Sequence, residues 1–196
     1  YDLISKTYPE TKNMRFWNSM GTSIYEITNM MKRLNLCRYC TFPNKENVTL
    51  NDLIYQLPDE ADNAYPDSER RFRFDIPTEK ININADKEQL LIAFNEIVSN
   101  CYEAGNDNDI IDISASLSDD KTHCTITFTN TGTLPDIKIQ KEFRQICNKE
   151  FYYPDDINIL SMAFYTTKPG HFGLGLFIAN TCLLYTSPSP RDGATS

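Results

Sequence analysis

Three polar residues on a helix expected over residues 86–104 have side chains that could bind a hydrated metal ion. Glu96 and Asn100 are four residues apart, so their side chains project from one helix face, one turn apart. Glu103 lies on a neighbouring part of that face. Carboxylate and amide oxygens suit a hydrated Mg²⁺, which prefers oxygen ligands and keeps several waters. Alone the pattern is weak, because polar pairs at this spacing usually form solvated helix surface.

Two further segments contain groups suited to a nucleotide. Asn130 directly follows an expected strand and could offer its amide to an adenine edge, and Gly132 permits a tight turn. Lys168 stands just before the glycine-rich residues 170–175, which lead into an apolar helix. Glycines let backbone N–H groups approach phosphate, and a helix N-terminus favours anions. Each segment alone also fits an ordinary strand-ending turn or a flexible hinge.

In this order the segments resemble the N, G1, F and G2 boxes of the GHKL ATPase superfamily. That superfamily includes histidine kinases, type II topoisomerases and mismatch-repair ATPases. LIAFNEIVSNCYEA resembles the N box, NTG the G1 box, and FYTTKPGHFGLGLFIA the F and G2 boxes. The TTK and GLGL parts are the most specific and are similar to those of sensor histidine kinases. The resemblance covers about residues 48–181.

The resemblance implies a Bergerat-type fold that binds ATP and Mg²⁺. Asn100 matches the Mg²⁺-binding asparagine, and Glu96 would reach the metal through water or act as a general base. Glu96, Asn100 and Lys168 would carry the phosphoryl transfer. The residues that the match places at the nucleotide are Asn100, Glu103, Asn130, Gly132, Thr166, Thr167, Lys168, Gly170, Gly173, Leu174, Gly175 and Leu176.

The G1 segment departs from the family pattern, which commonly reads DxGxG. Asn130 replaces the adenine-reading aspartate, and residues 133–135 after Gly132 read Thr-Leu-Pro. A neutral amide should weaken one hydrogen bond to the adenine amino group by about 1 kcal/mol. We therefore expect weakened ATP affinity, and a nucleotide-free pseudokinase stays open as an alternative.

The surrounding elements predict an α+β fold. A short helix is expected over 48–57, a polar loop over 59–70, and strands over 71–76, 110–117 and 124–129. This order indicates a two-layer α/β sandwich of Bergerat type, with helices over one face of a mixed sheet.

A narrow apolar stripe precedes this domain. Its members alternate at steps of three and four residues: Trp17, Met20, Ile24, Ile27, Met31 and Leu34. Such an a/d stripe favours a helix that pairs with other helices over one that lies on a globular core. It resembles the second helix of the dimerisation and phosphoacceptor hairpin, which implies a homodimer. The first histidine is His123, in an expected strand, so the phosphoacceptor is expected upstream or absent.

The pattern stops near residue 181, because residues 182–192, CLLYTSPSPRD, match a translated DNA adapter of sequencing libraries. We expect a partial helical hairpin over 1–46, a C-terminally truncated ATP-binding domain over 47–181, and an artefactual tail over 182–196. The formal net charge of −8 argues against a nucleic-acid partner. No apolar run is long enough to span a bilayer, and residues 1–10 lack the basic and apolar regions of a signal peptide. This segment is therefore expected to be cytoplasmic and without membrane contact, and a membrane anchor upstream in the full-length protein stays open.

The function predicted from the sequence is the ATP-binding catalytic module of a sensor histidine kinase. It would transfer the γ-phosphate of ATP to a histidine outside this chain, from which it passes to an aspartate of a response regulator receiver domain. A hydrolytic GHKL ATPase is the alternative that Glu96 suggests. The heptad helix before the domain, and the lack of room for a transducer domain after it, favour the kinase.

Overall fold

The computed structural model describes residues 1–68, 71–106, 108–120, 123–132, 163–164, 166, 168 and 171–186. The chain divides into two compact units, Tyr1–Tyr39 and Cys40–Ser196. Residues 133–135, Thr167, Gly170 and most of the predicted tail lie outside the described residues.

The first unit consists of helices. A short helix α1 (Asp2–Thr7) and a 3-10 turn η1 (Pro9–Asn13) precede the long helix α2 (Trp17–Tyr39). The ring of Tyr1 stacks on Trp17 with 5.0 Å between centroids, and Trp17 Nε1 donates to Ser5 Oγ at 3.1 Å. None of the 23 residues of α2 is buried, so its predicted apolar stripe stays uncovered within this unit.

The second unit is built on a mixed sheet. Strand β4 (Ile110–Leu117) lies in the centre, parallel to β2 (Arg71–Asp75) and antiparallel to β5 (Cys124–Thr129). A separate pair joins β1 (Glu46–Thr49) and β3 (Asn82–Ala85) in antiparallel register. The predicted strands over 110–117 and 124–129 match β4 and β5 residue for residue.

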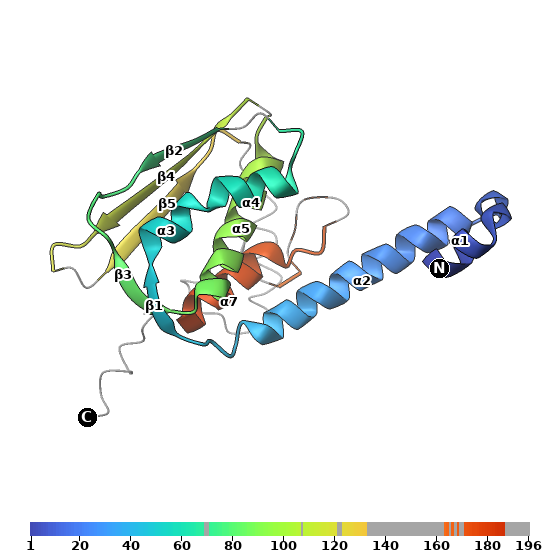
Figure 1. Ribbon diagram of the computed structural model, residues 1–196, viewed down its shortest axis with the longest axis horizontal. Coiled ribbons are helices and arrows are strands. Elements are labelled where there is room, and N and C mark those ends of the chain that lie inside the picture. Colours follow the sequence, from blue (N-terminus) through green and yellow to red (C-terminus); the bar gives the residue numbers. More distant parts are fainter. Residues whose placement is uncertain are drawn as a thin grey trace, which may run out of the picture. The chain divides into compact units, whose positions relative to one another are not determined.

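Within the described residues of this unit, the helices are α3 (Leu50–Tyr55), α4 (Leu57–Ala64), α5 (Lys87–Ala104) and α7 (Gly175–Thr186). In Figure 1, α3, α4 and α5 cover one face of the sheet, and α7 lies beside α5. The predicted two-layer sandwich with a mixed sheet is therefore confirmed.

The core lies between α5 and the sheet. Alternate residues of β4, namely Ile111, Ile113 and Ala115, are buried because successive side chains of a strand point to opposite faces. Phe94 of α5 is 2% exposed, and its ring centroid lies 5.6 Å from that of Phe128 on β5. At its start, α5 is capped by Asp86, whose carboxylate accepts from Gln89 N at 3.0 Å. Capping and core packing thus fix α5 at its N-terminus and along one side.

Two predicted segments near the start of this unit were partly wrong. The predicted helix over 48–57 begins only at Leu50, because Val48 and Thr49 pair with β3 instead. The predicted loop over 59–70 is helical up to Ala64. A proline at the start of α4 and acidic residues in its first turn favour helix initiation, and Leu57 and Ala61 bury one face.

Helix α7 continues past the predicted end of the genuine sequence. Its last five residues, 182–186, belong to the predicted artefactual tail, and Cys182 and Thr186 are buried. The origin of residues 182–196 stays a prediction. Among the residues with described positions, no helix combines the length and the apolar character needed to cross a bilayer.

Candidate functional site

The last two turns of α5 present the predicted metal-binding face. Asn100 Nδ2 donates to the backbone oxygen of Glu96 at 2.9 Å, which leaves the Asn100 side-chain oxygen as its acceptor for other groups. That oxygen, Oδ1, accepts from Lys168 Nζ at 3.4 Å. The side chain of Glu96 is half-buried on the same helix, and its role stays a prediction.

Lys168 also forms an ion pair with Glu103, with 2.5 Å between Nζ and Oε2. The two side chains are 32% and 29% exposed, so water only partly screens their charges. His171 Nδ1 lies 3.8 Å from the same carboxylate oxygen. The structure therefore brings the glycine-rich segment onto the C-terminal turns of α5, although 65 residues separate Glu103 from Lys168.

The turn after β5 packs against the C-terminal end of α5. Asn130 Nδ2 donates to the Cys101 carbonyl at 3.4 Å. Gly132 approaches the helix so closely that a Cβ there would lie 2.6 Å from the Ala104 carbonyl oxygen and 2.5 Å from Asn130 Nδ2. A side chain at position 132 would therefore displace this turn. Because the nitrogen of the Asn130 amide faces the protein, its oxygen is the group that it can offer to a ligand, as an acceptor.

The described part of the glycine-rich segment forms a closed loop. The Phe164 backbone N–H donates to the Gly173 carbonyl at 2.9 Å, and Gly173 has a φ of 64°, a left-handed conformation that favours glycine. Within the loop, the Lys168 backbone N–H donates to Thr166 Oγ1 at 3.1 Å. This loop leads directly into α7, and it carries the ammonium group that reaches α5.

Helix α7 begins at the end of this loop. Leu174 is 1% exposed, and its carbonyl accepts the first helical bond, from Ile178 N at 2.8 Å. Gly175 is the first residue of α7, and Leu176 follows it, half-buried. Backbone N–H groups at such a helix start are suited to phosphate.

Two residues of this network were missed by the sequence reasoning. Ser99 Oγ donates to Glu103 Oε1 at 3.4 Å and is itself bonded to the hydroxyl of Tyr65 at 2.7 Å. The ring of Tyr65 stacks on Tyr102 of α5 with 4.4 Å between centroids. Ser99 had a usable signal, because it stands four residues before Glu103 on the same helix. Tyr65 had none, because it lies within the segment over 59–70 that was predicted to be a polar loop.

The side chains that gather here fit a weakly held Mg²⁺. Within the described ranges, no cluster of three or more His, Cys, Asp and Glu side chains is arranged to hold a metal. Mg²⁺ does not need such a cage, since it keeps several waters and is usually bound by one or two protein oxygens together with substrate phosphates. Asn100 Oδ1 and the Glu103 carboxylate are oxygen donors of this kind.

Comparison with known sequences gives one clear relative. No protein-family model matches the chain. Sensor protein VanS of Enterococcus faecium is 31% identical over 147 residues, which are 72% of this chain and 35% of VanS. The chain thus spans about a third of the length of this relative.

Solved structures share the fold. The catalytic domain of histidine kinase ThkA has a TM-score of 0.54 at 20% identity, over 71% of this chain and 80% of that chain. The mycobacterial sensor histidine kinase MprB has a TM-score of 0.54 at 16% identity, over 73% and 80%. Acinetobacter baumannii histidine kinase AdeS has a TM-score of 0.58 at 10% identity, over 86% and 72%.

The second unit has a fold of the GHKL type, which these histidine kinase structures share. The chain is a relative of the sensor histidine kinases, and its second unit has the fold of their catalytic domain, as the sequence predicts.

Proposed function

We propose that this chain contains the ATP-binding catalytic module of a sensor histidine kinase, which transfers the γ-phosphate of ATP to a histidine outside the chain. The observation that carries the proposal is the convergence of Asn100, Glu103 and Lys168 from two segments that lie far apart in the sequence. These are the amide, carboxylate and ammonium groups that a Mg²⁺-bound triphosphate requires.

Each part of the site has a role in this proposal. Asn100 Oδ1, with Glu96 acting through water, would hold the Mg²⁺ that neutralises phosphate charge when bound. Lys168 would place a positive charge beside the phosphates, and the N–H groups at the start of α7 would bind their oxygens. Of the predicted nucleotide contacts, Thr167 and Gly170 lie outside the described residues and stay predictions.

Asn130 would bind the base. Its oxygen is an acceptor, and the amino group of adenine is a donor, whereas guanine presents an acceptor at the corresponding position. A neutral amide supports a weaker bond than a carboxylate, so this site would bind ATP with reduced affinity but keep its preference over GTP.

The exposed stripe of α2 supports a homodimer. Met20, Ile24, Ile27, Met31 and Leu34 are between 42% and 60% exposed, and an a/d stripe of this kind pairs with other helices. In a histidine kinase dimer, the segment of the protein given by this chain would lie in the cytoplasm. The phosphoryl group would pass from the phosphorylated histidine to a response regulator receiver domain. The remaining alternatives are a hydrolytic ATPase, if Glu96 activates water, and a nucleotide-free module.

The proposal is tested by Mg²⁺-dependent ATP binding, measured by calorimetry. Asn100→Ala should weaken binding at least tenfold, which corresponds to about 1.4 kcal/mol. The control is Asn84→Ala, which removes an exposed amide from β3 and should leave binding unchanged, with circular dichroism to show that each variant is folded. A folded wild-type protein that binds no ATP would favour the nucleotide-free module.

A second assay separates kinase from hydrolase. The chain is incubated with [γ-³²P]ATP and an isolated histidine-kinase hairpin that carries a phosphoacceptor histidine. A kinase labels the hairpin with an acid-labile phosphoryl group, whereas a hydrolase releases inorganic phosphate at the same rate with or without it. The hydrolytic alternative is correct if two results are obtained together. The wild type releases phosphate but does not label the hairpin, and Glu96→Gln abolishes that release.

A further inference from the structure

The ammonium group of Lys168 lies where a metal would be expected. Asn100 directs its nitrogen to the Glu96 carbonyl, so Oδ1 is the atom with which it would bind Mg²⁺. In the structure that atom accepts from Lys168 Nζ at 3.4 Å, and the same ammonium lies 2.5 Å from Glu103 Oε2. The ammonium group of Lys168 therefore contacts both oxygen atoms that would be ligands of a metal at the candidate site.

Glu103 is held in place from its own helix. Its Oε1 accepts from Ser99 Oγ at 3.4 Å, and Ser99 is bonded to the Tyr65 hydroxyl at 2.7 Å. Tyr65 in turn stacks on Tyr102 of α5, which is 8% exposed. The carboxylate is thus linked by these contacts to the helices of the domain, and Lys168 reaches it from the other segment.

We propose that Lys168 is a tethered cation that occupies the metal position before nucleotide binds, and that Glu103 is the residue that positions it there. This inference rests on the proposed function, because it takes Asn100 as the metal ligand. A divalent cation and an ammonium group repel each other at these distances, and both need the lone pairs of Asn100 Oδ1. Metal entry therefore requires Lys168 to leave that oxygen.

Nucleotide makes this exchange favourable. The phosphates of Mg²⁺-bound ATP offer Lys168 new anionic partners at the moment when the metal takes Asn100. A free metal ion brings no phosphate for Lys168 to contact. It must therefore displace the ammonium group from Asn100 and Glu103 without giving it a new anionic partner. The arrangement selects metal that arrives with a nucleotide over metal alone.

The test uses Mn²⁺ alone as the probe, without nucleotide. Paramagnetic broadening of the backbone amide signals around Asn100 in the ¹⁵N-labelled chain reports Mn²⁺ at this site rather than elsewhere on an acidic protein. Lys168→Met should bind Mn²⁺ there about tenfold more tightly than the wild type, although it should bind Mg²⁺-ATP more weakly. Lys87→Met makes the same charge change at the far end of α5, about 20 Å away, and should leave both affinities unchanged.

The positioning role of Glu103 has its own readout. In a Glu103→Gln background the ammonium is no longer held over Asn100, so Lys168→Met should change the Mn²⁺ affinity less than about twofold. The proposal is overturned by equal Mn²⁺ affinities in the wild type and Lys168→Met, by the same gain in both backgrounds, or by no local broadening in any of these proteins. Failure of the wild type to bind Mg²⁺-ATP is a separate result, which removes the proposed function instead.

Discussion

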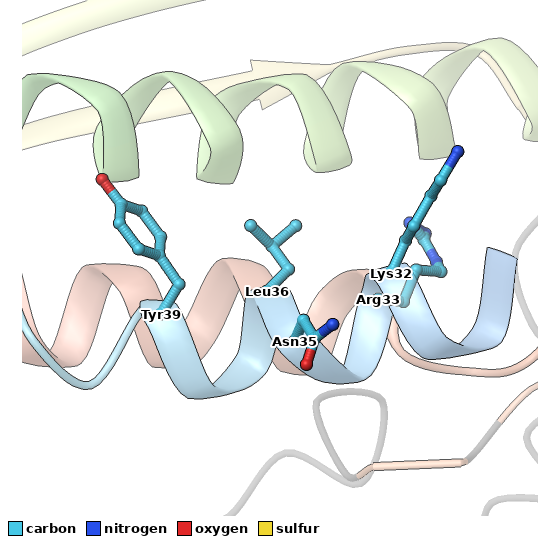
Figure 2. Close-up of a pocket in the computed structure, with 5 residues that line it drawn as sticks. All are labelled: Lys32, Arg33, Asn35, Leu36 and Tyr39. Atoms are coloured by element: carbon cyan, nitrogen blue, oxygen red, sulfur yellow. The ribbon is translucent and has the colours of Figure 1, made fainter. Parts of the chain in front are cut away.

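Helices α2 and α5 are the two longest helices described, and they differ in how far their apolar residues are buried. None of the 23 residues of α2 is buried, whereas α5, with 18 residues, buries seven of them. Figure 2 shows Lys32, Leu36 and Tyr39, which are not members of the apolar stripe, projecting from one side of α2 at the steps of four and three that a helix face requires. Apolar periodicity therefore indicates that a face will be covered. Among the described residues of its own unit, α5 has such a covering surface, whereas the apolar stripe of α2 stays exposed.

The largest effect is expected from a cavity beneath α5. Phe94→Ala removes a ring that is 2% exposed and packs on Phe128, so it should lower the free energy of unfolding by about 3–5 kcal/mol. Urea denaturation followed by circular dichroism measures the loss. The matched change on α2 is Tyr25→Ala, at a residue 68% exposed, which should cost less than about 0.5 kcal/mol. Similar losses for the two variants would contradict the comparison.

The next effect concerns the partner of α2. Ile27→Asp puts a charge in the middle of the apolar stripe, where pairing would bury it, and should weaken self-association at least 100-fold, or about 2.7 kcal/mol. Sedimentation equilibrium measures the dissociation constant. Thr22→Asp places the same charge on the outward side of the heptad and should have little effect. A wild-type protein that stays monomeric at high concentration would contradict the pairing of α2 with a second copy of this chain.

A smaller effect is expected at the start of α5. Asp86 is 3% exposed and accepts from Gln89 N at 3.0 Å and from Asn44 N at 2.6 Å. Asp86→Ala removes the N-cap and should cost about 1–2 kcal/mol of unfolding free energy in the same urea assay. Asp59→Ala, in the first turn of α4 where no side chain caps the helix, should cost less than about 0.5 kcal/mol. Equal costs would mean that the cap does not anchor α5.

The smallest effect is a pH dependence at β5, the strand beside α5. Burial raises the pKa of the Cys124 thiol above its ordinary value. The folded protein then holds this proton more tightly than the unfolded chain, so the contribution to stability is complete below the unfolded pKa, near 8.5, and is lost as pH rises through the folded pKa. Cys124→Ala should therefore lose less unfolding free energy than the wild type between about pH 8 and pH 10. Identical pH profiles would show that the thiol is not protected in the folded state.

The extent of sequence prediction differs among particular elements. Strands β4 and β5 were predicted residue for residue, because apolar and polar side chains alternate along β5 and along β4 from Ile111 onward. The segment from Val48 to Ala64 was predicted poorly, since its strand depends on pairing with β3 and its helices lack an unbroken periodic stripe. Local periodicity fixes an element only where the element does not depend on a distant partner.

The sequence by itself determined α5, β4, β5 and the three motifs on which the resemblance rests, because these depend on residue types at short spacing. Only the tertiary structure decided that Lys168 meets Asn100 and Glu103, that Gly132 packs on the end of α5, and that Tyr65 supports the carboxylate through Ser99. Such contacts join residues dozens of positions apart, and burial of a shared core brings their segments together. The charge that faces Asn100 is therefore a property of the folded domain rather than of any one motif.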